Sequence, residues 1–349
     1  MLVVKCSGSP REIGKQHGAS AAAQIARCID FYTGMFVKTS SLGWNDVLAL
    51  AESFAERIKA VWPEFYEEME GIAEGSGRST LDIVALNVRT EIAFGCFSDG
   101  CTSLSWQSDE HSFLAQNWDW LPAQKQNLIV LEIHRSQATG ANPNPSIKMI
   151  TEAGIIGKIG FNSAGVGVCL NAIRAHGMEP SRLPVHLALR IALECTSTTQ
   201  AIDTLKKYGV ASSAHILIAD SETSAGCEVT AKTIAVLPMD ERGRVIHSNH
   251  LLLEHPGVVD TAWLKDSPFR VERMLKLTDD LVEGGEGTGK PTWDGLEGLF
   301  ADRENAPAAI CRSGDIETLF NIVMDLKARR AVVRVGRPDL VEERFELGF

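Results

Sequence analysis

The sequence predicts an α+β protein in which antiparallel sheets are covered by helices. Helical and strand-like segments come in blocks along the chain, without strict alternation of strand and helix. The 349 residues are enough to bury a large core, and no internal repeat or low-complexity segment divides them. We therefore expect residues 1–349 to form a single layered domain.

The first hundred residues are expected to be mostly helical. Apolar residues recur every three to four positions, as on one face of a helix, in segments 21–32, 44–61, 63–75 and 80–94. Ser79 or Thr80, followed by Asp82, provides a cap for the last of these helices.

From residue 101 the apolar pattern changes to short, β-rich segments bounded by Gly, Pro, Asn or Ser, as is typical of consecutive antiparallel strands. The first group of strands is predicted at 101–106, 112–118, 127–134, 146–151, 157–165 and 166–173. The second group is predicted at 214–220, 225–231, 233–238 and 244–249.

Helices are expected around these strand groups. They are predicted at 184–194, 199–208, 268–281 and 293–301, with Pro184 in a first-turn position. Segments 317–326 and 329–336 are expected to close the chain as a hairpin.

Charge and hydropathy limit the partners. A net charge of −11 and a pI near 5.4 argue against nucleic acid as a ligand, which needs a basic face. No run of about 18 apolar residues predicts a membrane span. The first residues lack the basic and apolar regions of a signal peptide, so we expect a cytoplasmic protein.

A glycine precedes a cysteine at the expected start of a strand, in Asp99-Gly100-Cys101-Thr102-Ser103. Such a bond can cut itself when the sulfur attacks the Gly100 carbonyl and the resulting thioester is hydrolysed. Glycine permits strained or positive-φ backbone and leaves the carbonyl open. The cut would give fragments 1–100 and 101–349. The new α-amine of Cys101, with an intrinsic pKa of roughly 7.7 to 8.0, could act as the base for its own thiol.

Several motifs, in order over nearly the whole chain, resemble the acyl-coenzyme A:6-aminopenicillanic acid acyltransferases (isopenicillin N acyltransferases) and their bacterial relatives. They are SPREIGKQHG, DGCTSLSW, AQNWDW, SNHLL and ICRSGDIETLFNIVMDLKARRAVVRVGRPD. Members of that family are self-processing N-terminal nucleophile (Ntn) hydrolases. The resemblance implies a four-layer αββα sandwich of two antiparallel sheets and cleavage after Gly100. Because the amphipathic helices of 1–100 need the rest of the chain for burial, the fragments should remain a heterodimer.

The resemblance also implies a role for each site residue. Cys101 corresponds to the nucleophile, and Asn249 to a side-chain amide of the oxyanion hole. Asp119 corresponds to a carboxylate that orients the free amine or holds Arg312, which corresponds to an active-site arginine. A second, substrate-contacting serine of the family aligns with neither Ser212 nor Ser213 securely, so both are left unassigned.

The expected reaction is two-step acyl transfer through an acyl-Cys101 intermediate, with water or an amine as the acceptor. Linear amides, such as small acylated peptides, and coenzyme A thioesters are the candidate substrates. No cofactor or metal is expected. The carboxyl end, FELGF, is not a peroxisomal tripeptide of the SKL type, which favours a bacterial or other cytoplasmic relative over an enzyme of penicillin synthesis.

Two other functional classes are left open by the residues alone. Cys101 could be activated by His250 or His215 in an unprocessed hydrolase with a papain-like cysteine–histidine pair. Alternatively, the chain could be a binding protein without activity on the same scaffold. Both alternatives predict an intact chain.

Structural interpretations compete with the functional ones. The remaining cysteines, and even Cys96 and Cys101 as a pair, could be buried core thiols, and Trp118 and Trp120 could be core or wall an acyl pocket. Asn117 and Asp119 could cap a turn at a strand end, Asn249 could be an ordinary loop residue, and Arg312 could lie on the surface.

Two further motifs are expected to carry no chemistry. His247 and His250 are expected on opposite faces of a strand, which disfavours a shared metal. The segment 284–290, GGEGTGK, departs from a phosphate loop at Pro291 and is expected to be a flexible loop.

Overall fold

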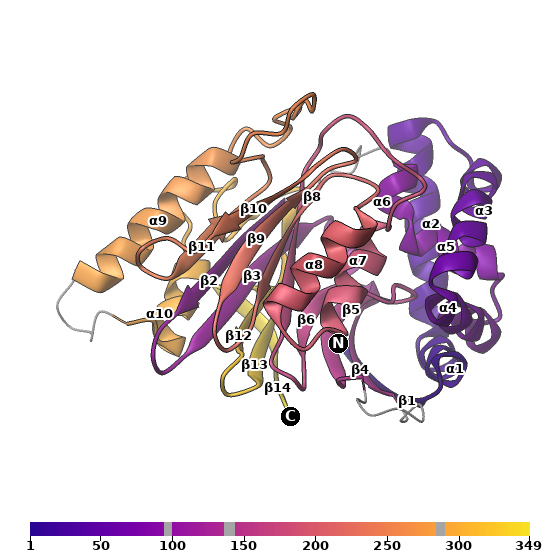
Figure 1. The fold of residues 1–349 in the computed structure, drawn as a ribbon, viewed down its shortest axis with the longest axis horizontal. Helices are drawn as coiled ribbons and strands as arrows, with labels where there is room; N and C mark the ends of the chain where they lie inside the picture. Colours follow the sequence, from indigo (N-terminus) through magenta and orange to yellow (C-terminus); the bar gives the residue numbers. More distant parts are fainter. Residues whose placement is uncertain (94–99, 136–143, 284–289) are drawn as a thin grey trace.

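Two β-sheets lie face to face, and helices cover both outer faces (Figure 1). The computed structural model describes residues 1–93, 100–135, 144–283 and 290–349. Helices α7 and α8 contact one sheet, and α9 and α10 contact the other. This arrangement confirms the four-layer αββα sandwich that the family resemblance implied. The segment 284–289 of the glycine-rich motif and Cys96 lie outside the described residues.

The larger sheet has eight strands, and its neighbours are antiparallel except for one pair. Strands β1 and β4 run parallel, with Leu2 opposite Ile129. In spatial order the strands are β1 (Leu2–Gly8), β4 (Leu128–Arg135), β5 (Ile147–Glu152), β6 (Ile159–Asn162), β7 (Gly167–Ala172), β8 (Ala214–Ala219), β9 (Ser224–Val229) and β10 (Ile234–Pro238).

The smaller sheet has six antiparallel strands and holds the predicted site. Its β2 and β3 pack against β7 of the larger sheet, so the sandwich core lies between these strands. In spatial order the strands are β11 (Arg244–His247), β2 (Gly100–Gln107), β3 (Ser112–Trp120), β12 (Glu317–Asp325), β13 (Arg330–Arg337) and β14 (Leu340–Gly348).

Helices of the first hundred residues gather at one end of the molecule, coloured indigo to purple in Figure 1. They are α1 (Pro10–Ser20), α2 (Ala22–Ser40), α3 (Trp44–Val61), α4 (Pro63–Ser76), α5 (Thr80–Asn87) and α6 (Arg89–Ile92). The later helices are the 3-10 helix η1 (Pro122–Asn127), α7 (Val185–Leu193), α8 (Thr198–Tyr208), α9 (Ser267–Glu283) and α10 (Trp293–Phe300). Ser79 caps α5 as predicted, whereas Pro184 is the residue before α7 instead of its first.

Strand β1, helix α1 and strand β14 were not predicted from the sequence. Two glycines, Gly14 and Gly18, weaken the helical signal of α1 because glycine is a poor helix former. Their small size is needed where α1 crosses α4, since a Cβ on Gly14 would overlap the backbone carbonyl of Glu68. Gly71 of α4 faces α1 in the same way. The SPREIGKQHG motif is therefore a helix-packing motif.

Buried polar contacts bind residues 1–93 to the rest of the chain. Arg190 of α7 makes two hydrogen bonds to the Glu68 carboxylate, at 2.9 and 2.6 Å. Arg89 lies 2.8 Å from the Glu152 carboxylate, and His17 Nε2 accepts a hydrogen bond from the Gly154 N–H. These groups are buried. The helical block therefore shares its core with the two sheets.

No helix among the described residues is both long and apolar enough to cross a membrane.

Candidate active site

Cys101 is fully buried near the start of β2, and its backbone is held on both sides. Its N–H donates to Asn249 Oδ1 at 2.9 Å. Its carbonyl accepts from Ser248 Oγ at 3.1 Å and from Arg270 Nη1 at 2.6 Å. Strand β2 lies between β11 and β3, so the peptide unit is fixed within a sheet. The residue expected to be the nucleophile therefore has little freedom of position.

The two faces of β2 separate the thiol from the charged groups. Successive side chains of a strand point to opposite faces. Cys101 belongs to the cluster between the sheets, whereas Leu104 and Trp106 pack toward α9 and α10. Asp119 is opposite Gly100 in the register, and Trp118 is opposite Cys101. The Asp119 side chain thus lies beside the Gly100–Cys101 backbone, on the opposite sheet face from the thiol.

Position 100 requires glycine because the side chains of Asp119 and Arg312 lie close to its backbone. A Cβ at this position would lie 2.9 Å from Asp119 Oδ2 and 3.2 Å from Arg312 Nε. Gly100 is not among the glycines with positive φ, so close approach rather than a left-handed backbone accounts for glycine here. The bond expected to be cut therefore lies directly against a carboxylate and a guanidinium.

Asp119 is buried and forms an ion pair with Arg312, whose Nε lies 3.5 Å from Asp119 Oδ2. Thr318 Oγ1 donates to the other carboxylate oxygen at 2.7 Å. Burial raises the pKa of Asp119, and the charges of Arg312 and Arg270 offset this only in part. Oδ2 has no hydrogen-bond partner among the described residues. One carboxylate oxygen is thus available beside Gly100.

Asn249 links the two sheets at the site. Its Oδ1 accepts from the Cys101 N–H and from Arg270 Nη2 at 2.8 Å, and its Nδ2 donates to the Ala172 carbonyl at the end of β7. The Asn249 N–H donates to Ser267 Oγ at 2.7 Å. In the intact chain the amide oxygen faces Cys101, so Asn249 is more than an ordinary loop residue.

Arg270 was not predicted and is fully buried beside Cys101. Besides Cys101 and Asn249, its guanidinium contacts Thr102 Oγ1 at 2.9 Å and Asp266 Oδ2 at 2.8 Å. Asp266 also pairs with Arg312, which joins the two arginines. Burial lowers the pKa of Arg270. Its signal in the sequence is an arginine on the apolar stripe of α9, next to Val271 and in line with Met274.

The four predicted residues therefore converge, although they come from distant parts of the chain. Cys101 and Asp119 lie on neighbouring strands, Asn249 lies just after β11, and Arg312 lies before β12. Direct contacts join Cys101 to Asn249 and Asp119 to Arg312. Arg312 is buried rather than on the surface.

The histidines suggested as alternative bases have other hydrogen-bond partners. His215 Nδ1 bonds Asn171 Oδ1 at 2.9 Å, and His250 Nδ1 bonds Ser267 Oγ at 2.7 Å. Burial lowers the pKa of both rings. His215 stacks on His247 with 3.6 Å between ring centroids. These contacts do not favour the cysteine–histidine pair.

The expectation for His247 and His250 is wrong in its geometry. Strand β11 ends at His247, and the two rings lie 6.4 Å apart between centroids rather than on opposite faces of a strand. Across the described parts of the chain, no group of three or more His, Cys, Asp or Glu side chains could hold a metal ion.

Asn117 does not cap a turn, because both it and Asp119 lie within β3. Its Nδ2 donates to the carbonyls of Phe300 and Ile310, each at 2.9 Å. Trp118 is fully buried with the Lys158 ammonium 3.6 Å from its ring centroid, so it packs in the core.

Ser212 and Ser213 are buried just before β8, next to the strand that carries Ala172. Ser212 Oγ donates to Glu91 at 2.7 Å, which gives it a structural partner. Ser213 Oγ has no hydrogen-bond partner among the described residues.

The cysteines that the structure describes, other than Cys101, have the character of core thiols. Burial raises the pKa of Cys195 to about 11 and that of Cys6, Cys227 and Cys311 to about 12. A thiol with such a pKa is almost entirely protonated near neutral pH and is a poor nucleophile.

The layered arrangement is that of the Ntn-hydrolase fold. Two variant crystal structures of the conjugated bile acid hydrolase from Clostridium perfringens are similar to this structure. Each has a TM-score of 0.50 and 12% sequence identity, and the likeness covers 71% of this chain and 92% of that chain. At this identity the likeness shows the fold alone.

Sequence comparison narrows the class to one family. A profile described as "Acyl-coenzyme A:6-aminopenicillanic acid acyl-transferase" matches residues 106–340. The acyl-coenzyme A:6-aminopenicillanic-acid-acyltransferase 40 kDa form of Emericella nidulans is 40% identical over 358 aligned positions, which cover 100% of this chain and 96% of that protein. The chain belongs to this acyltransferase family, as its motifs indicated.

Proposed function

We propose that the protein is a self-processing cysteine Ntn acyltransferase or amidohydrolase, with Cys101 as the nucleophile for both processing and catalysis. One observation carries the proposal: Asn249 holds the Cys101 nitrogen while the Asp119 carboxylate lies against Gly100. A hydrogen-bond acceptor thus lies at the nitrogen that cleavage would release, and a carboxylate lies beside the preceding residue.

Processing begins with attack of Cys101 Sγ on the Gly100 carbonyl carbon. A carbon–sulfur bond forms, the Gly100–Cys101 peptide bond breaks, and the departing nitrogen takes up the thiol proton. Water then hydrolyses the thioester, which restores the thiol and leaves a carboxylate on Gly100. The steps need no cofactor, because the chain supplies both the nucleophile and the leaving amine.

The released α-amine would remain near Asn249 Oδ1, which already accepts from the same nitrogen. Asp119 Oδ2 has no hydrogen-bond partner among the described residues and lies where Gly100 departs, so it can accept from the new amine. Asp119 would thus orient the amine rather than contact the thiol. The amine would then take the thiol proton when a substrate carbonyl arrives.

Acyl transfer would follow in two steps through an acyl-Cys101 intermediate. The tetrahedral oxyanion needs donors, and the Asn249 Nδ2 amide and a backbone N–H are the proposed ones. In the intact chain Nδ2 is held by the Ala172 carbonyl. Arg270 and Arg312 act as positioning residues, because they fix Asn249 and Asp119.

The substrate class follows from the family and is a proposal for this chain. The Emericella relative is named as an acyl-coenzyme A:6-aminopenicillanic-acid-acyltransferase. We propose a coenzyme A thioester or a linear amide as the acyl donor, and an amine or water as the acceptor. The balance between acyl transfer to an amine and hydrolysis by water depends on how well the site excludes water.

Denaturing electrophoresis tests the proposal. The purified protein should give two bands, of about 100 and 249 residues if cleavage follows Gly100, and the larger should begin Cys-Thr-Ser. Cys101→Ala should give only the full-length chain. Cys195→Ala, at another buried thiol, is the matched control and should be processed normally. Normal processing of Cys101→Ala would rule out the assignment of the nucleophile.

Electrophoresis combined with an activity assay separates the alternatives. An intact chain whose activity is lost on thiol alkylation would support the cysteine–histidine hydrolase. An intact chain without acyl transfer activity would support the binding protein.

A further inference from the structure

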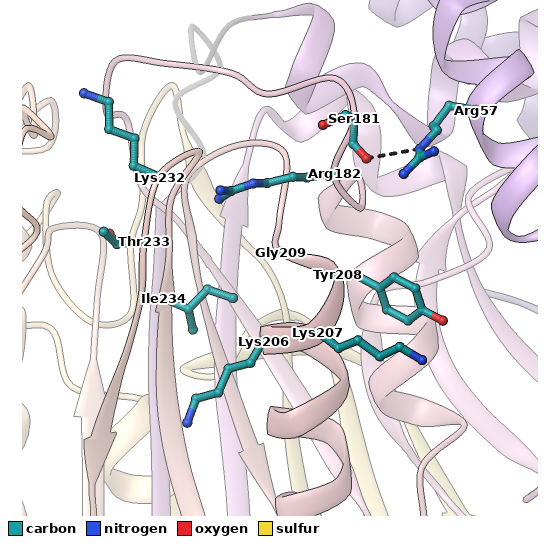
Figure 2. A pocket seen from close by; sticks show the side chains of 10 residues that line it. All are labelled: Arg57, Ser181, Arg182, Lys206, Lys207, Tyr208, Gly209, Lys232, Thr233 and Ile234. Carbon is teal, nitrogen blue, oxygen red and sulfur yellow. Dashed lines mark hydrogen bonds between the residues drawn. The ribbon is translucent and has the colours of Figure 1, made fainter.

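A pocket of about 570 Å³ outside the candidate active site is lined by five cations (Figure 2). They are Arg57, Arg182, Lys206, Lys207 and Lys232. The other lining residues are Ser181, Tyr208, Gly209, Thr233 and Ile234, so no carboxylate lines the pocket. This concentration of positive charge stands in a chain with a net charge of −11.

None of the five cations takes part in an ion pair within the parts of the chain that the structure describes. Arg57 Nε donates to the Ser181 carbonyl at 3.1 Å, and Lys232 Nζ donates to the Gly257 carbonyl at 2.7 Å. A guanidinium has five N–H donors and an ammonium three, so both retain donors for a ligand.

Local backbone geometry opens the pocket. Gly209 follows the last residue of α8 with a φ of +65°, and a Cβ there would lie 2.8 Å from Arg182 Cδ. The Arg182 side chain therefore rests against Gly209. Figure 2 shows the Arg182 guanidinium between the side chains of Lys232 and Arg57, with Lys206 on the other side of Gly209. The carboxyl-terminal end of α8 carries about half a negative charge from the helix dipole, which would repel an anion. This repulsion is far weaker than the attraction of the five cations.

The pocket is connected to the active site by a short path through the backbone. Gly209 is five residues before Ala214, so their Cα atoms are at most about 18 Å apart. Ala214 pairs with Ala172, about 5 Å away, whose carbonyl holds Asn249. The pocket therefore lies within about 25 Å of the group that holds Cys101. A long ligand with anionic groups at one end and a reactive group at the other would fit this separation.

We propose that this basic pocket binds the phosphate-bearing nucleotide end of a coenzyme A thioester donor. The choice of ligand rests on the proposed function. Coenzyme A carries a diphosphate and a 3′-phosphate at the end opposite its thiol, which matches several cations far from the nucleophile. Ile234 supplies an apolar surface on which the nucleoside can rest. Arg57 comes from the 1–100 segment, so both fragments of a processed chain would form the pocket.

Equilibrium binding of coenzyme A itself tests the proposal without turnover. The native protein should bind coenzyme A more weakly as salt is added, because ions screen exposed charges. Adenosine 3′,5′-bisphosphate should compete, whereas pantetheine at the same concentration should not. Lys206→Gln combined with Lys232→Gln should weaken binding at least about tenfold, the scale of losing charged contacts. The two lysines are exposed, so the fold should be retained, which a melting curve checks.

A double variant with the same charge change is the matched control. Lys38→Gln combined with Lys276→Gln alters two exposed lysines outside the pocket and should leave binding within about twofold. Equal binding by the pocket variant and the control would overturn the proposal. Competition by inorganic pyrophosphate as strong as that by the bisphosphate nucleoside would overturn it too, because the pocket would then be a general anion site.

The outcomes for processing and for binding are separable. The measurement is repeated on Cys101→Ala, which should remain uncut. A native chain that binds coenzyme A through these lysines but is never cut contradicts the proposed self-processing and supports the pocket. If the native chain is cut, but replacing the two pocket lysines leaves coenzyme A binding unchanged, only the proposal for the basic pocket is contradicted.

Discussion

Arg270 holds the carbonyl of Cys101, with 2.6 Å between Nη1 and the oxygen. The same guanidinium donates to Asn249, so one buried side chain sets the position of both the expected nucleophile and its neighbour. A planar fork of donors can do this, whereas an ammonium offers a point charge without fixed directions. The position of the Cys101 backbone therefore depends on a residue of α9.

Replacing Arg270 by lysine keeps the charge but removes the fork. We expect the chain to fold and the rate of processing to fall at least about tenfold, since misplacement of a reacting group by about 1 Å can cost 100-fold. Cell-free synthesis followed by denaturing electrophoresis measures this rate. Arg273→Lys, one turn along α9 and paired with Asp302, is the control and should process normally. A normal rate for Arg270→Lys would show that the contact is dispensable.

Adding a single methyl group at Gly100 should block processing. The Cβ of Gly100→Ala would lie 2.9 Å from Asp119 Oδ2, closer than carbon and oxygen normally approach, so the backbone or the carboxylate must shift. The fraction of cut chain after purification reports the effect. Gly34→Ala in α2, whose Cβ would meet nothing within 4 Å, should be fully cut and more stable by about 0.5–1 kcal/mol. A fully cut Gly100→Ala chain would contradict the importance of this close approach.

Asp119→Asn should change the pH dependence of stability and, separately, slow processing. The pKa of Asp119 is raised in the folded chain, so between its ordinary pKa and the raised one the unfolded chain loses a proton that the folded chain keeps. The stability of the native protein should therefore fall, relative to Asp119→Asn, as pH rises through this interval. Urea unfolding at several pH values from about 4 to about 7 measures the trend. Processing should nevertheless be slower in Asp119→Asn, because an amide cannot hold the new amine as a carboxylate does.

Loss of a different, exposed carboxylate provides the control for that experiment. Asp315 is exposed and lies in the loop before β12. The substitution Asp315→Asn therefore removes one negative charge without disturbing Asp119. A pH trend in Asp119→Asn that equals the trend in Asp315→Asn would contradict the role of the buried carboxylate.

Arg190→Met should loosen the helical block from the sheets. The variant leaves Glu68 buried without its guanidinium partner, and breaking such a pair costs about 3–5 kcal/mol. Arg242→Met removes an exposed pair with Asp279 and should cost less than about 1 kcal/mol. Urea unfolding of both variants compares the two costs. If the native chain is cut, size exclusion should also show less complex between the fragments for Arg190→Met. Equal costs would mean that this buried pair does not hold the block in place.

Part of the site follows from local sequence. Segments 101–106 and 112–118 were predicted as neighbouring strands, and a short hairpin fixes the register that brings Asp119 opposite Gly100. Asn249 and Arg312 come from more than 100 residues away, and only the family motifs indicated them. Their positions depend on packing between sheets, which a local pattern does not contain.

Other features could not be predicted from local patterns. Arg270 would be assigned to solvent by its charge alone, although the helical spacing of α9 places it on the buried stripe with Val271 and Met274. Strand β1 pairs in parallel with a strand more than 120 residues later, so its partner is fixed by the whole fold. The glycines that weaken the helical signal of α1 in the sequence are needed for the packing of α1 on α4.

The parallel pairing of β1 with β4 joins residues on either side of the expected cleavage site in one sheet. If the chain is cut after Gly100, a strand from the first piece is left as the outermost member of a sheet otherwise built by the second. Either piece made alone would present an open row of backbone donors and acceptors, ready to associate wrongly. If cleavage occurs, we therefore expect it to follow folding, and two separately produced halves should not simply be mixed to give the native protein.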